Sequence, residues 1–63
     1  MKQEIETRLM TIQMSLYYLN QDLINFSEPF SEEYAPWKAK ATEKEIKRLE
    51  KEHQQLIQKV NWF

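Results

Sequence analysis

Apolar residues recur along both halves of the chain at alternating intervals of four and three residues. This spacing keeps one narrow stripe of a helix facing a neighbouring helix, as in a coiled coil. The pattern therefore predicts two amphipathic helices that pack along these stripes, and we call the stripe residues the seam. The seam residues are Ile5, Leu9, Ile12, Leu16, Leu19, Leu23 and Phe26 in the first half, and Ile46, Leu49, His53, Leu56, Val60 and Phe63 in the second.

The ends of the helices are predicted from proline, because the chain contains no glycine and its two prolines, Pro29 and Pro36, lie between the periodic segments. We expect a single all-α domain, residues 1–63, with a helix over 3–26, a connection over 27–36 and a helix over 37–62. A short connection makes the two helices antiparallel neighbours, so the fold class is a two-helix hairpin. The start of the second helix stays open, because Thr42 and Glu45 have the spacing of a capping box.

Two registers fit the hairpin, because facing residues of an antiparallel pair have a constant sum of residue numbers. A sum of 65 places Leu16 opposite Leu49 and requires the second helix to begin near Trp37. A sum of 72 places Leu16 opposite Leu56 and suits a helix that begins at Thr42. We expect the sum of 65, because both helices then end level with one another.

A second apolar row follows the first helix outside the seam and consists of Met10, Met14, Tyr17 and Ile24. A lone hairpin would leave this row exposed, whereas the adjacent Tyr18 points to another face of the helix. One interpretation is burial in a homodimeric four-helix bundle, and the other is docking of a foreign protein helix. We expect a homodimer, because a 63-residue chain without cysteine has a marginal core and no disulfide to support it.

The connection between the helices is both aromatic and acidic. Our preferred interpretation is that the aromatic side chains in and next to it, Phe30, Tyr34 and Trp37, together with Trp62 and Phe63 at the other end, close the two ends of the hairpin core. The alternative is that the tip of the hairpin contacts a partner. The candidate residues for that contact are Phe30, Glu32, Glu33 and Tyr34.

Charge is unevenly distributed although the net charge is only −1. Residues 28–35 carry three glutamates and no basic residue, whereas residues 36–63 carry seven basic and four acidic residues. A homodimeric bundle could bind RNA or DNA through the basic face of the second helix, with Lys40, Lys44, Lys47, Arg48 and Lys51 as candidates. We disfavour this interpretation, because Glu43, Glu50 and Glu52 interrupt the face and no aromatic residues are interleaved with it.

Catalysis, cofactors and metals are not expected. The chain has one histidine, His53, which follows Glu50 at the spacing used in di-iron bundles. The first helix offers no inward glutamate between Leu9 and Leu23 to complete such a site. Two packed helices also provide no pocket for an enzyme.

The absence of cysteine, of an apolar run near 18 residues and of a leader after Met1 favours a cytoplasmic protein and no membrane partner. Its size is typical of small bacterial or phage proteins. We therefore expect a protein-interaction module, either a regulator, an inhibitor or an adaptor, that acts through apolar helix faces. The alternatives are the nucleic-acid-binding bundle and a purely structural assembly protein.

Overall fold

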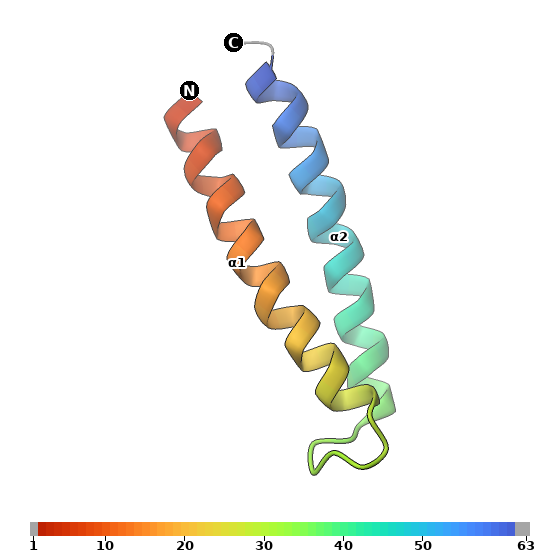
Figure 1. Cartoon of the computed structure of the whole chain (residues 1–63). Helices are drawn as coiled ribbons and strands as arrows, with labels where there is room; N and C mark the ends of the chain where they lie inside the picture. The colour runs from red at the N-terminus through yellow and green to blue at the C-terminus, as the bar shows by residue number, and fades with distance from the viewer. Residues whose placement is uncertain (1, 62–63) are drawn as a thin grey trace.

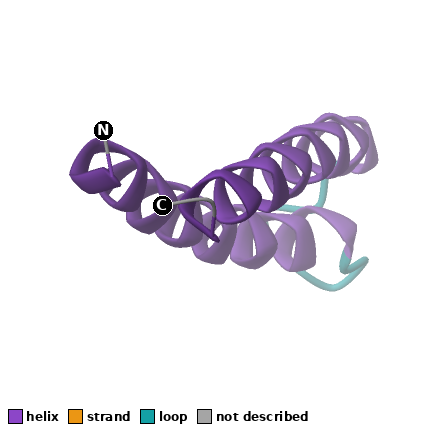
Figure 2. Ribbon diagram, turned by 90° about the horizontal axis from the view of Figure 1, so that it is seen from above, coloured by secondary structure: helices purple, strands orange, loops and turns teal. Residues whose placement is uncertain are grey.

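The structure, a computed structural model that describes residues 2–61, is an antiparallel helical hairpin. Helix α1 spans Lys2–Ser27 and helix α2 spans Pro36–Asn61. The helices lie alongside one another from the loop to the opposite end of the molecule (Figure 1). Over residues 2–61 the molecule contains only these helices and one loop (Figure 2). The predicted all-α hairpin is confirmed, while the predictions for Trp62 and Phe63 lie outside the described residues.

Helix α1 extends without interruption because residues 2–27 contain neither proline nor glycine. Its last turn is closed by a side chain, since the Ser27 hydroxyl donates a hydrogen bond of 2.6 Å to the carbonyl oxygen of Leu23. The Glu28 amide makes one further helical bond of 3.0 Å to the carbonyl of Ile24. Pro29 cannot donate such a bond, and the chain turns away from the helix there.

The loop between the helices, residues 28–35, consists of two successive tight turns and a return to α1. The Ser31 amide donates to the carbonyl of Glu28, and the Tyr34 amide donates to the carbonyl of Ser31. The Ala35 amide then donates a bond of 2.9 Å to the carbonyl of Phe26, which joins the start of α2 to the end of α1. Among the described residues no backbone takes a positive φ, so this loop forms without glycine.

Helix α2 begins at Pro36, where the fixed φ of proline suits the first helical position and its missing amide hydrogen costs nothing. The Ala35 carbonyl accepts the first helical bond from the Ala39 amide at 3.0 Å. The capping-box interpretation of Thr42 and Glu45 is therefore wrong, because Thr42 is buried inside the helix. The Glu45 side chain accepts hydrogen bonds from Arg48 instead of capping a helix start.

The helices pack in the register with a sum of 65. Phe26 contacts residues 35 and 38, Gln13 contacts His53, and Arg8 contacts Glu52. The sums of these pairs range from 60 to 66, which fits a register of 65 and excludes one of 72. The same register brings Thr42 to the seam, in agreement with its burial. Near the loop the seam of α2 continues through two small residues, Ala35 and Ala39, opposite the large side chain of Phe26.

The core is thin because only two helices form it. The molecule measures 47 Å along its axis and only 15 by 11 Å across. Ile12 is the only large side chain that is fully buried among the described residues, and the leucines of the α1 seam stay partly accessible to water. A domain with so little buried apolar surface has a small margin of stability.

Candidate interaction surfaces

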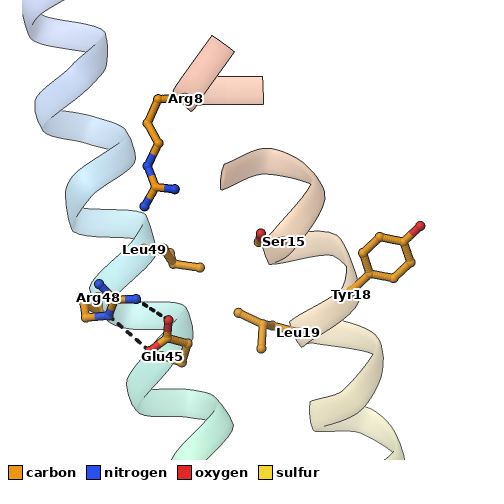
Figure 3. A pocket seen from close by; sticks show the side chains of 7 residues that line it. All are labelled: Arg8, Ser15, Tyr18, Leu19, Glu45, Arg48 and Leu49. Carbon is orange, nitrogen blue, oxygen red and sulfur yellow. Dashed lines mark hydrogen bonds and ion pairs between the residues drawn. The ribbon is translucent and has the colours of Figure 1, made fainter. Parts of the chain in front are cut away.

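An open groove of about 440 Å³ follows one side of the seam. Leu19 and Leu49 point into it from opposite helices, whereas Tyr18 lies at its edge and points away from α2 (Figure 3). Arg8 from α1 and Arg48 from α2 also line it, and each is paired with a glutamate. The groove is thus an open margin between two helices, and none of the residues that line it is an activated nucleophile or base.

A bidentate ion pair joins the helices above this groove. The Arg8 Nε and Nη2 atoms donate to the two carboxylate oxygens of Glu52 at 2.7 and 3.1 Å. The hydrogen bond from Arg8 is the main reason that the pKa of Glu52 lies below its ordinary value. In the same way, the hydrogen bond from Arg48 lowers the pKa of Glu45 within α2. Both glutamates on this side of α2 are therefore neutralised within the molecule.

His53 lies in the seam as the spacing predicts, but it is only partly buried. One of its ring nitrogens, Nε2, lies 3.4 Å from the side-chain amide nitrogen of Gln13 on α1. This contact lies at the side of the seam that faces away from Arg8 and Glu52. Within residues 2–61 no group of three or more potential metal ligands is close enough to hold a metal ion.

The outer face of α1 carries the second apolar row, and all four of its side chains are exposed. The exposed fractions are 65% for Met10, 57% for Met14, 63% for Tyr17 and 59% for Ile24. At 100° per residue the row lies about 145° around α1 from the seam, so α2 leaves it uncovered. Tyr18 is exposed as well, and its ring meets that of Tyr17 edge to face at 5.5 Å, which widens the apolar face.

Between Met10 and Ile24 this outer face is also free of charged residues, whereas Glu6 lies on the same side of α1 one turn before Met10. From Leu9 to Ser27 the only charged residue of α1 is Asp22, which lies near the seam rather than on the outer face. The positions on either side of the row are Thr11, Gln13, Asn20, Gln21 and Asn25. Such a face is unusual for a solvated helix, because the outer side of a surface helix normally carries charged residues.

The outer face of α2 is basic and differs in kind from that of α1. Because α2 begins at Pro36, Trp37 falls within the helix and continues a line of lysines at intervals of three and four residues. We call this line the lysine stripe, and it consists of Trp37, Lys40, Lys44, Lys47 and Lys51. All five side chains are exposed, and Trp37 is exposed by 70%. The stripe lies about 170° around α2 from the seam.

The acidic residues of this basic face lie on both sides of the stripe. Glu43 and Glu50 lie along one edge, and Glu52, which is paired with Arg8, lies on the other side. Arg48 is engaged with Glu45. An aromatic residue, Trp37, stands at one end of the stripe. Sequence reasoning missed this position of Trp37 because it assigned Trp37 to the aromatic side chains that close the core.

The aromatic residues of the loop do not close the core. Phe30 is 95% exposed and Tyr34 is 45% exposed, and Trp37 points outward from α2, so the interpretation of these residues as a plug is wrong. The end of the core is closed instead by Ala35 and Ala39 against Phe26, with the Lys38 ammonium 5.6 Å from the centre of the Phe26 ring. Glu32 and Glu33 are exposed beside Phe30 at the tip.

The comparisons with known proteins do not assign the chain to a family: no family model, no curated protein and no solved structure matches it. Neither helix of the described chain is long and apolar enough to cross a membrane. The candidate sites therefore follow from the surface of the hairpin itself, with an apolar face on α1, a basic stripe on α2 and an acidic aromatic tip.

Proposed function

We propose that the chain is a small non-enzymatic interaction module, a regulator, inhibitor or adaptor, that acts through the outer face of α1. The observation that carries this proposal is the exposure of Met10, Met14, Tyr17 and Ile24 on a face that has no charged residue between Met10 and Ile24. Exposed apolar rows of this kind mark interaction sites, and methionine adapts its shape to a partner surface.

We further propose that the occupant of this face is a second copy of the chain. The row has the same heptad spacing as the seam, with Gln21 at one of its positions, and between Met10 and Ile24 its flanking positions are polar but uncharged, so over this stretch two copies can meet without repulsion between like charges. Burying the four side chains and Tyr18 in both copies would remove roughly 1,000–1,300 Å² from water, near the lower bound for a stable interface. The thin core of the hairpin supports the same expectation.

The position of the row also determines the arrangement that we propose. A compact four-helix bundle turns the core side of every helix toward one common axis. The row lies nearly opposite the seam, so a dimer formed through it places the two α1 helices back to back, with each α2 on the outside. The dimer is then a layered array of four helices rather than a bundle around a common core.

Sedimentation equilibrium tests the proposal. We expect the wild-type mass to rise from 7.8 kDa toward twice that value at micromolar concentration. A Tyr17→Glu, Ile24→Glu variant should remain at the monomer mass while its far-ultraviolet circular dichroism stays helical, because both side chains are exposed in the hairpin. The matched control is Gln55→Glu, Gln58→Glu, which adds the same charge to exposed positions of α2.

The control variant should associate as the wild type does. A wild-type protein that stays folded and monomeric across this range would refute self-association. Equal loss of association in both double variants would show that charge, and not the outer face of α1, controls it.

A further inference from the structure

We propose that the lysine stripe of α2 is a binding site for single-stranded nucleic acid, with the lysines on the phosphates and Trp37 as a platform for a base. This site is on the opposite side of the hairpin from the outer face of α1. The inference is therefore independent of the proposed function, and either one can fail without the other.

The charge of the stripe is available to a ligand. Lys40, Lys44, Lys47 and Lys51 are exposed, and within residues 2–61 none of them takes part in an ion pair. Glu45 is held by Arg48 within α2. Glu43 and Glu50 lie along one edge of the stripe, three or four residues from Lys40 and Lys47, but within residues 2–61 neither forms an ion pair with these lysines. The stripe is thus a local concentration of positive charge on a molecule whose net charge is −1.

The spacing of the stripe fits an extended phosphate backbone. Intervals of three and four residues correspond to rises of about 4.5 and 6 Å along the helix axis. This is of the same order as the distance between phosphates along an extended strand, and the flexible lysine side chains can absorb the remaining difference. From Trp37 to Lys51 the stripe is about 21 Å long, enough for a short run of nucleotides.

Trp37 distinguishes a single strand from the other polyanions. An indole ring that is 70% exposed at the head of a lysine row offers a stacking surface, and stacking on aromatic side chains is how proteins hold single strands without reading their sequence. The bases of a duplex are already stacked on one another and cannot use it. A membrane surface would need an apolar face beside the lysines, and the apolar face of α2 is occupied by the seam.

The binding experiment measures the fluorescence anisotropy of a labelled oligothymidylate titrated with the full chain at several salt concentrations. We expect micromolar affinity at low salt and a slope of log K against log salt of about −3, which is 0.7 for each of the four lysine–phosphate contacts. In a Trp62→Phe background, the fluorescence of Trp37 should be quenched on binding. Trp37→Ala should weaken binding at least about fivefold, the lower limit for loss of one stacked base.

Two matched variants separate the stripe from overall charge. The double variant Lys44→Ala, Lys47→Ala should bring the slope of log K against log salt closer to zero by about 1.4, because two phosphate contacts are lost. Lys2→Ala, Lys59→Ala removes the same charge from positions outside the stripe and should leave the slope unchanged. Circular dichroism confirms that each variant is folded, since all of these side chains are exposed.

Several results would overturn the inference. Annealed duplex, phosphatidylserine vesicles and polyglutamate serve as competing polyanions. If the duplex binds as well as the single strand or better, the stripe is a nonspecific polycation. If the vesicles do, it is a membrane-binding surface, and if polyglutamate does, it is a site for acidic proteins. Three other results would also refute the inference. The two double-lysine variants could change the salt slope equally, Trp37→Ala could leave the affinity unchanged, or the chain could fail to bind oligothymidylate at low salt.

Discussion

Replacing Ile12 with alanine tests the hairpin core, because Ile12 is the one large side chain with no exposed surface among the described residues. Truncating a fully buried isoleucine to alanine costs about 2–5 kcal/mol, since the cavity adds to the lost transfer free energy. A chain of 63 residues has a total free energy of unfolding of roughly 3–9 kcal/mol. Ile12→Ala should therefore remove about half of the stability and lower the urea midpoint by a similar proportion.

Ile24 supplies the matched control, because the same substitution there removes a side chain that is 59% exposed. We expect Ile24→Ala to change the free energy of unfolding of the isolated hairpin by no more than about 0.5 kcal/mol. Both substitutions are made in a Tyr17→Glu background, so that self-association does not add to the measured stability.

The assay is urea unfolding followed by far-ultraviolet circular dichroism, with the midpoint and the slope fitted together. The expected result is a large drop in the midpoint for Ile12→Ala and almost none for Ile24→Ala. Equal losses at the two positions would contradict the described seam, as would a larger loss at Ile24.

Two further predictions concern the contacts between the helices. Because the bond from Arg8 holds the pKa of Glu52 below its ordinary value of 4.5, the ion pair stabilises the fold above that pH and is lost as the pH falls through the lower folded pKa. The wild type should therefore have a higher urea midpoint than Glu52→Gln at pH 6. The difference should shrink progressively as the pH is lowered below 4.5, and a difference that stays constant would exclude the pair. The register is tested by engineered disulfides, because the chain has no native cysteine. On non-reducing gels, Leu16→Cys with Leu49→Cys should cross-link within one chain, whereas Leu16→Cys with Leu56→Cys should not. The opposite outcome would indicate a register shifted by one heptad.

The hairpin itself could be predicted from the sequence, because an unbroken alternation of three and four residues is a long-range signal that few other folds share. The exposed row on α1 followed from the same spacing, since Met10, Met14, Tyr17 and Ile24 are out of phase with the seam. Periodicity sets the phase of every residue on its helix. It therefore identifies the faces well before any coordinates are known.

The start of α2 could not be predicted with the same certainty, because a capping box is a local pattern of two residues. Thr42 and Glu45 match it, yet the tertiary contacts decide otherwise. The Ala35 amide bonds to the carbonyl of Phe26, and Thr42 is buried within α2. The misplaced aromatic plug has the same origin, since the direction of Trp37 depends on whether the helix has already begun.

The pairing of charges also depended on the register. Arg8 and Glu52 lie 44 positions apart in the chain, and no local pattern associates them. Their pairing, together with that of Arg48 and Glu45, separates a neutralised edge of α2 from its lysine stripe. On the sequence alone, Glu45, Arg48, Glu52 and the lysines belonged to one mixed basic and acidic helix, and nothing associated Arg8 with it.

Oxidative footprinting of Met10 and Met14 tests the central claim most directly, because it reports on the outer face of α1 in the unmodified protein. Both thioether side chains are more than half exposed in the hairpin, so both should oxidise readily at high dilution. Dimerisation through this face predicts that their oxidation slows as the protein concentration rises through the micromolar range, as mass spectrometry of proteolytic fragments would show. Rates of oxidation that stay constant while sedimentation shows dimers would contradict the account, because the second copy would then cover a different face.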